Sequence, residues 1–384
     1  MISRSRIKTA LLTAVLISLS AGAFAQGPTP FDAPLAAGET VLIAAAAPMP
    51  EGHRVEAGAD VPVLHYRLHL PADYHDGKGK TYPVMFIAAP GGNAEMGPMR
   101  DILHRDRWIV AMMVESRNGS NLWVANFAAA YNDLMQRARV QKTMLFCTGM
   151  SGAAKVCSVY PQIRPGFRGM ILQAAGPWGH KTFRQPANAN LIVYGTFGTH
   201  DPNFHHARSL RVSLPDGVRR MVEIWQGGHS WAPSDVFARA LTWTVAAACD
   251  VDRYDPADRE AYRWRVVNQL AEFEAGASTI ERHVLAADLR SAVKTWRPAL
   301  DESLVARVNA ILAADSEASP PDNEIAAWHA WRKAMADDES GHGKDIDATA
   351  APYQQIIDQY PGTHFAKLAA QRLQTLHWET GQYP

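Results

Sequence analysis

The chain of 384 residues contains few cysteines. There are three, Cys147, Cys157 and Cys249, and an odd number cannot pair completely within one chain. None stands in C-x-x-C spacing, which argues against a zinc knuckle or a thioredoxin-type site. Cys147 and Cys157 flank an expected strand-to-helix turn. Bridged Cα atoms lie within about 7 Å, whereas packed elements sit about 10 Å apart, so we expect both thiols to be reduced and buried.

The chain also lacks an excess of either charge. Lys plus Arg and Asp plus Glu both total 38. Nucleic-acid binding needs a basic face to neutralise phosphates, and a polybasic membrane patch needs clustered cations. After the N-terminal segment, no stretch reaches the roughly 20 apolar residues that span a bilayer. We therefore expect no nucleic-acid partner and no integral membrane segment in the mature chain.

The N-terminus has the three parts of a secretory signal peptide. Arg4–Lys8 is basic, Ala10–Leu19 is a short apolar run, and Ala23–Ala25 is a small-residue cleavage site. Gln26 is then the expected first mature residue, and because it is not cysteine we expect no lipid anchor. The sequence predicts an exported protein, periplasmic or secreted, with residues 1–25 removed.

Short apolar runs alternate with helical or loop segments up to about residue 248. The expected strands are Val41–Ile43, Val63–Leu70, Tyr82–Ala88, Trp108–Val114, Thr143–Thr148, Gly169–Gln173, Asn190–Tyr194 and Met221–Trp225. The expected helices include Trp123–Ala138 and Pro233–Ala248. This alternation predicts an α/β domain, residues 26–250, with a mostly parallel sheet flanked by helices.

The remaining third, residues 251–384, has a different pattern. Asp250–Asp258 is acidic and is expected to be a linker, and Tyr262–Ala275 and Ile280–Trp296 are expected helices. A polar break is expected at Asp337–Lys344. The tail resembles half of a tetratricopeptide unit, but no repeat recurs at a fixed period. An appended C-terminal helical domain is the interpretation favoured over a repeat array.

The motif with the clearest chemical meaning is Gly149-Met-Ser-Gly-Ala153. It directly follows an expected strand and precedes Ala154–Val159, which can begin a helix. Acyl-transfer hydrolases place a serine on such a sharp strand-to-helix turn, which crowds the positions two before and two after it. Gly149 and Ala153 are small enough, although the usual pattern ends in glycine. Ser151 is the candidate nucleophile, and the alternative is a small-residue turn without chemistry.

Three segments carry a family resemblance. They are Phe146–Lys155, Tyr194–Asp201 and Gly227–Trp231, within a matching region of about residues 61–248. They resemble the nucleophile turn, the acid-bearing loop and the histidine loop of the α/β-hydrolases. Secreted short-chain esterases of the polyhydroxyalkanoate depolymerase and feruloyl esterase type are the relatives they resemble most. The order serine, aspartate, histidine is also that of the α/β-hydrolase fold.

The resemblance implies a catalytic triad of Ser151, His229 and Asp201. A serine hydroxyl is a poor nucleophile until a neighbouring base takes its proton, and imidazole titrates near neutral pH. The carboxylate of Asp201 would orient the imidazole and stabilise its protonated form. Gly227 and Gly228 permit the tight loop that such a histidine occupies. The alternative for His229 is a surface loop histidine.

An oxyanion needs fixed donors, and the backbone is expected to supply them. Gly152, the residue after the nucleophile, would provide one N–H. Gly91 or Gly92, in the loop after the strand Tyr82–Ala88, would provide the other. Many relatives have histidine before the paired glycines, whereas this chain has Ala89-Pro90.

Other polar and aromatic residues suggest less specific roles. His200, His205 and His206, near the candidate acid, could hold zinc, but a polar loop is the favoured interpretation and no metal or cofactor is expected. Trp178 and Trp231 are candidate substrate-binding residues, with ordinary packing as the alternative.

Together these features predict an exported serine hydrolase that cleaves an ester bond through an acyl-enzyme. The expected partner is a small-molecule or polymeric ester. The same triad serves esterases, peptidases and depolymerases, and the sequence does not separate them. The alternative is a non-catalytic binding protein that uses its helical C-terminal domain for interaction.

Overall fold

The structure is a computed structural model, and it describes eleven stretches of the chain. These are residues 37–46, 63–76, 79–178, 183, 190–215, 218–249, 259–274, 279–297, 300–314, 321–339 and 345–380. The expected signal peptide at 1–25 and the expected linker Asp250–Asp258 lie outside the described residues.

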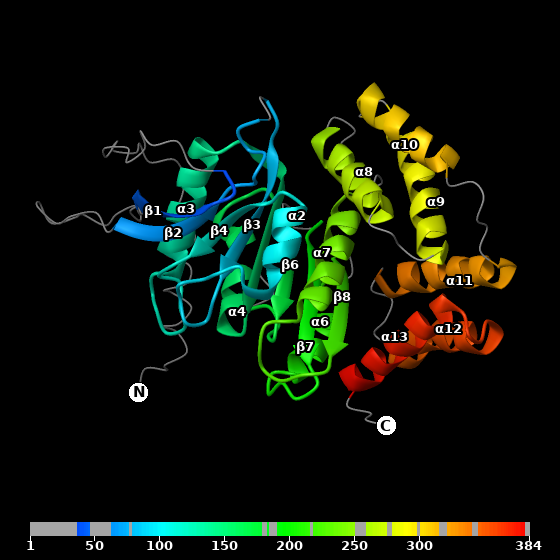
Figure 1. The fold of residues 1–384 in the computed structure, drawn as a ribbon. Helices are drawn as coiled ribbons and strands as arrows, with labels where there is room; N and C mark the ends of the chain where they lie inside the picture. The colour runs from blue at the N-terminus through cyan, green and yellow to red at the C-terminus, as the bar shows by residue number, and fades with distance from the viewer. Residues whose placement is uncertain are drawn as a thin grey trace, which may run out of the picture. The chain divides into compact units, whose positions relative to one another are not determined.

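Within the described stretches, eight strands form one mixed sheet (Figure 1). They are β1 (Thr40–Ala46), β2 (Val63–His69), β3 (Tyr82–Ala88), β4 (Ile109–Met113), β5 (Val140–Met150), β6 (Phe167–Gln173), β7 (Ile192–Gly198) and β8 (Arg219–Trp225). The strand order is β1-β2-β4-β3-β5-β6-β7-β8. β2 pairs antiparallel with β1 and β4, and the pairs β3–β4, β3–β5, β6–β7 and β7–β8 are parallel. The prediction of a mostly parallel sheet flanked by helices is confirmed.

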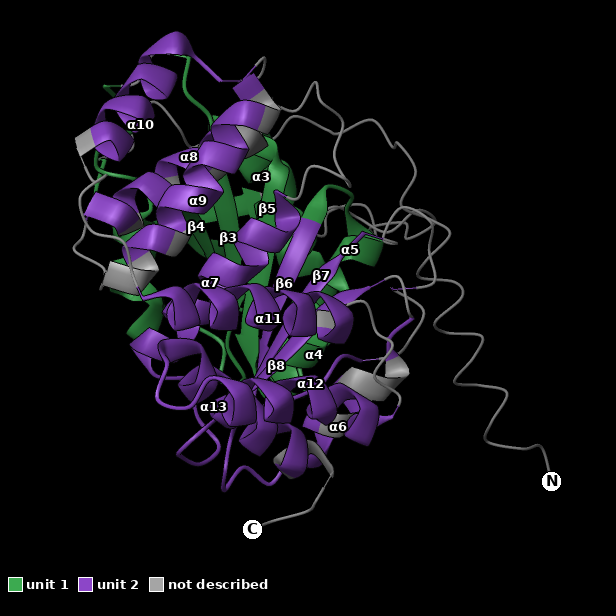
Figure 2. Ribbon diagram, turned by 90° about the vertical axis from the view of Figure 1, so that its right-hand side faces the viewer, with its two compact units in different colours: residues 1–167 green, residues 168–384 purple. Residues whose placement is uncertain are grey.

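The chain divides into two compact units, residues 1–167 and 168–384 (Figure 2). The first contains β1–β5 with the 3-10 turn Gly97–Met99 and the helices α2 (Arg100–Arg105), α3 (Trp123–Arg137), α4 (Gly152–Cys157) and α5 (Tyr160–Ile163). Every residue of β3 is buried, as expected of a central strand. Aromatic rings fill the core beside it, with Trp108 edge-on to Phe146 at 5.3 Å and Phe127 stacked on Tyr160 at 3.7 Å between ring centres.

In the residues that the structure describes, the second unit joins β6–β8 to eight helices. They are α6 (His205–Ser213), α7 (Ser234–Ala248), α8 (Arg259–Glu274), α9 (Thr279–Trp296), α10 (Glu302–Ala314), α11 (Asp322–Glu339), α12 (Ile346–Gln359) and α13 (His364–Thr380). The C-terminal third is therefore helical, as predicted. The predicted break at Asp337–Lys344 begins too early, because α11 continues to Glu339 and buries Asp338.

The C-terminal helices contact the sheet through its last strand, within the second unit. Arg372 of α13 donates from Nη1 to the carbonyl of Val222 in β8 at 2.8 Å, and from Nε to Asp338 of α11 at 2.8 Å. Both side chains of this ion pair are almost fully buried. Because β8 is the last strand in the sheet order, it has unpaired backbone groups on one side. Arg372 satisfies one of these groups.

Two strands differ in length from the sequence-based prediction in ways that matter for function. β5 runs on to Met150, so it ends immediately before Ser151. β7 ends at Gly198, four residues later than expected, and thus just before Asp201. Gly195 and Thr196 pair in register with both β6 and β8, and Phe197 and Gly198 pair with β8. Hydrogen bonding to neighbouring strands extends β7 through a segment that hydrophobicity alone does not mark.

Candidate active site

Ser151 lies at a strained turn between β5 and α4. Its backbone angles are φ 56° and ψ −124°, a region that non-glycine residues rarely occupy. Such strain is retained where the surrounding structure enforces it, and it is concentrated at active sites. A methyl group on Gly149 would lie 2.6 Å from the Ala153 carbonyl. Only glycine fits there, which confirms the steric argument made from the motif.

The two glycines in the loop after β3 differ in whether their backbone N–H groups are hydrogen-bonded. Gly92 adopts φ +75° and donates its N–H to the Ala89 carbonyl at 3.0 Å, and a methyl group there would lie 2.8 Å from the Val114 carbonyl. In the described chain, no hydrogen bond engages the N–H groups of Gly91 or Gly152. Of the two glycines suggested by sequence, Gly91 is therefore the one with a donor to offer a ligand.

Asp201 and His229 form a hydrogen-bonded pair in the second unit. His229 Nδ1 lies 2.8 Å from Asp201 Oδ1, and the aspartate side chain is fully buried while the imidazole is 32% exposed. A proton on Nδ1 donated to the carboxylate leaves Nε2 as the basic nitrogen. The Asn203 N–H donates to the same carboxylate oxygen at 2.8 Å, which fixes its position.

Hydrogen bonds join the loop that carries Asp201 to the loop that carries His229. The His200 N–H donates to the Gly227 carbonyl at 2.8 Å, and the Gly227 N–H donates to Thr199 Oγ1 at 3.3 Å. A side chain on Gly198 would collide with the carbonyls of Gly227 and Gly228. The histidine loop thus lies directly on the end of β7, which is how residues 28 positions apart meet.

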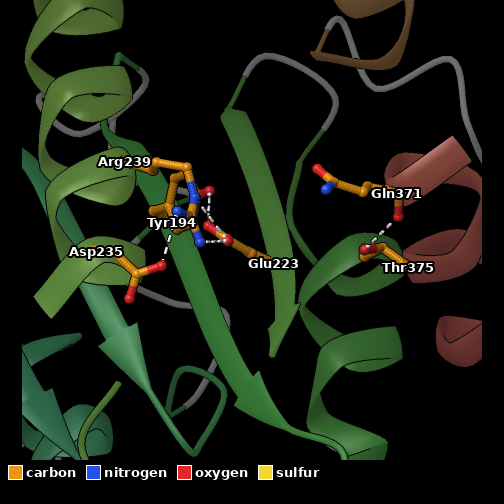
Figure 3. A network of polar contacts seen from close by, with 6 residues as sticks. All are labelled: Tyr194, Glu223, Asp235, Arg239, Gln371 and Thr375. Carbon is orange, nitrogen blue, oxygen red and sulfur yellow. Dashed lines mark hydrogen bonds and ion pairs between the residues drawn. The ribbon is translucent and has the colours of Figure 1, made fainter. Parts of the chain in front are cut away.

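A polar network fixes β8, the strand that leads into the histidine loop (Figure 3). Tyr194 in β7 donates from its hydroxyl to Glu223 in β8 at 2.8 Å. Arg239 in α7 reaches the same glutamate at 2.6 Å and also Asp235 at 3.0 Å. Burial, together with the Glu223 carboxylate, raises the pKa of the Tyr194 phenol well above its usual value, so the phenol remains a donor.

The candidate tryptophans and the histidines near Asp201 lie in the second unit. Trp178, after β6, is 53% exposed, and Trp231 is half-buried two residues beyond His229. The rings of His205 and His206 lie 4.2 Å apart. Among the residues that the structure describes, no group of three or more His, Cys, Asp and Glu side chains is placed to hold a metal ion. No described helix is long and apolar enough to cross a bilayer.

Cys147 and Cys157 are buried and form no disulfide, as expected, and Cys249 is buried without a disulfide as well. The reason given from sequence, a wide separation of strand and helix, is wrong. Cys147 Sγ lies 3.4 Å from the Cys157 carbonyl, and Cys157 Sγ lies 3.0 Å from the Thr148 carbonyl. Burial raises the pKa of the Cys147 thiol well above its usual value, with the neighbouring Cys157 as a further cause. The Cys147 thiol therefore stays protonated and can donate to the Cys157 carbonyl.

Sequence reasoning missed two residues of this region, Asn118 and Asn126. Asn126 is buried in α3 and binds the backbone at the start of the loop after β4. Asn118, in that loop, covers Gly152. Neither residue stands in a recognisable motif. The one signal available was the glycine at position 152, and a glycine does not reveal which side chain lies beside it.

The strand order and the serine turn together identify the fold. A serine on a sharp turn between a strand and a helix of a mostly parallel sheet is characteristic of it. The chain has the α/β-hydrolase fold. No protein-family model and no curated protein matches the sequence.

Solved structures with similar folds include esterases and peptidases. A ferulic acid esterase matches at 12% identity with a TM-score of 0.43, over 54% of this chain and 98% of its own. Est1E from Butyrivibrio proteoclasticus matches at 11% with a TM-score of 0.37, over 49% and 97%. Dipeptidyl peptidase 4 from Porphyromonas gingivalis matches at 13% with a TM-score of 0.41, over 55% of this chain and 36% of its own. At such identities the likeness concerns the fold alone.

Proposed function

We propose that the protein is a serine hydrolase that cleaves a carboxylic ester through an acyl-enzyme, with Ser151 as nucleophile, His229 as base and Asp201 as the group that orients the base. The observation that carries the proposal is the strained backbone of Ser151 at the strand-to-helix turn. The hydrogen bond between His229 and Asp201 supports it, because it sets the tautomer that a general base requires.

In the proposed reaction, Ser151 Oγ attacks the ester carbonyl while His229 Nε2 accepts its proton. The carbonyl oxygen becomes an oxyanion, which the N–H groups of Gly152 and Gly91 stabilise. The protonated imidazole then gives its proton to the departing alkoxide, leaving the acyl group on Ser151. Water attacks the acyl-enzyme with the same base, releasing the carboxylic acid and the free serine.

The site also fits the wider class of acyl hydrolases, because peptide cleavage uses the same steps with an amine as leaving group. We propose an ester substrate, small or polymeric, and place Trp178 and Trp231 at its binding surface. We also propose export, on the basis of the N-terminal segment. N-terminal sequencing of the protein recovered from outside the cytoplasm should begin at Gln26.

The decisive experiment is labelling with a fluorophosphonate probe alongside turnover of 4-nitrophenyl esters. The protein should be labelled at Ser151, and Ser151→Ala should remove both labelling and turnover while circular dichroism stays unchanged. Ser234→Ala, which alters an exposed serine at the start of α7, is the matched control and should behave as the wild type. Labelling that persists in Ser151→Ala would refute the assignment. A folded wild type without labelling or turnover would favour a non-catalytic binding protein.

A further inference from the structure

The loop between β4 and α3, residues 114–122, is held by hydrogen bonds near its start. The buried side chain of Asn126 accepts from the N–H groups of Glu115 at 3.1 Å and Ser116 at 3.0 Å, and donates to the His65 carbonyl at 2.8 Å. Glu115 in turn accepts from the His65 N–H at 2.9 Å. This loop is therefore a fixed part of the first unit, because its backbone donors are bound to a side chain that packing immobilises.

Asn118 lies at the middle of this loop and contacts both segments that carry the proposed oxyanion donors. Its N–H donates to the Pro90 carbonyl at 2.8 Å, which ties it to the residue before Gly91. Its side chain covers Gly152 so closely that a methyl group there would overlap Oδ1 and lie 2.8 Å from Cγ. Asn118 thus contacts Pro90, which precedes Gly91, and covers Gly152.

The carboxamide of Asn118 is available to a ligand. The side chain is exposed, and it makes no hydrogen bond to any residue that the structure describes. A primary amide carries two N–H donors. The backbone groups of Gly91 and Gly152 contribute one donor each, so the three residues together present a cluster of hydrogen-bond donors.

We propose that Asn118 is a third donor of the oxyanion site, with its side-chain amide directed at the carbonyl oxygen of the ester as that oxygen becomes negative. The proposal rests on the proposed function of Ser151. An asparagine amide is a suitable donor because it is neutral and keeps both of its N–H donors at every pH. The interaction strengthens as the oxygen becomes charged, so it acts mainly on kcat rather than on KM.

The test compares two substitutions at this position. Asn118→Ala removes the side chain, while Asn118→Asp keeps its shape but replaces the donors with a carboxylate. Both should lower kcat by about 10²–10³-fold with little change in KM, which is the usual effect of losing an oxyanion donor. The rate of fluorophosphonate labelling should fall in parallel. Asn121→Ala, an exposed asparagine of the same loop, is the control and should stay within about twofold of the wild type.

A role for Asn118 as a spacer alone predicts a different result. In that case Asn118→Asp, which fills the same volume, would retain wild-type kcat, and this outcome would overturn the proposal. Wild-type kcat in Asn118→Ala would overturn it as well. In both cases the wild type would still label at Ser151, so the proposed function would stand. A wild type that does not label would refute the proposed function instead.

Gly152→Ala provides an independent check. It preserves the backbone N–H, but its methyl group displaces the Asn118 side chain. It should lower kcat strongly in the wild-type background and by much less in the Asn118→Ala background, where no side chain remains to be displaced. Equal losses in the two backgrounds would show that Gly152→Ala acts without Asn118 and would contradict the proposal.

Discussion

The buried ion pair between Arg372 and Asp338 permits a quantitative test of how the C-terminal helices contribute to stability. Arg372 is 8% exposed and Asp338 4%. Arg372 binds Asp338 and the Val222 carbonyl, both at 2.8 Å, and Tyr353 donates to the same aspartate at 3.0 Å. Substituting Arg372→Met keeps the aliphatic volume of the side chain but leaves the Asp338 carboxylate without its cation.

The cost of that substitution follows from burial. Removing one partner of a buried pair strands the other charge and costs about 3–5 kcal/mol, whereas replacing both with apolar residues is far less costly. The double variant Arg372→Met/Asp338→Leu leaves two neutral groups unpaired, the Val222 carbonyl and the Tyr353 hydroxyl. We therefore expect the double variant to be no less stable than either single variant, which corresponds to a coupling free energy of at least about 3 kcal/mol.

Urea titration followed by circular dichroism measures these free energies of unfolding. Arg307→Met is the matched control, since Arg307 pairs with Glu274 at the surface with side chains 58% and 38% exposed. An exposed pair contributes less than about 1 kcal/mol. The reasoning is refuted if Arg372→Met costs no more than Arg307→Met, or if the two single losses at Arg372 and Asp338 simply add in the double variant.

Three further predictions concern pH, the triad and the thiols. Burial, with His104 as a further cause, lowers the pKa of His69 from 6.5 to about 4. The unfolded chain then binds the extra proton, so the free energy of unfolding should fall by about 3 kcal/mol as the pH drops from 6.5 to 4. His69→Gln should flatten that part of the stability profile, and an unchanged slope would contradict the assignment. Asp201→Asn should lower kcat by about 10⁴-fold while leaving the fold intact; a loss below tenfold would remove Asp201 from the triad. Cys147 and Cys157 should react with Ellman's reagent only after unfolding, and rapid reaction of the native protein at either residue would show that the thiols are accessible.

Several features of the fold could be predicted from the sequence because their causes are local. The run Tyr82–Ala88 is apolar at every position, and a strand buried on both faces requires that. The small residues Gly149 and Ala153 around Ser151 reflect steric crowding within five residues, so the strained turn is visible in the motif itself. The strand ends were less well predicted, because pairing with neighbouring strands, rather than a continuous apolar run, extends β7 through Gly195 to Gly198.

The contacts between distant segments were decided by the tertiary structure. The sequence proposed the partners Asp201 and His229, but the bond between them depends on the histidine loop lying on the end of β7. Asn118 meets Gly152 across 34 positions, and no spacing rule or motif connects them. Local sequence determines the backbone angles and the periodicity of burial, and therefore the turn on which the serine lies. The side chain that packs beside that turn is determined by the order of strands in the sheet. That order exists only once many segments have packed together.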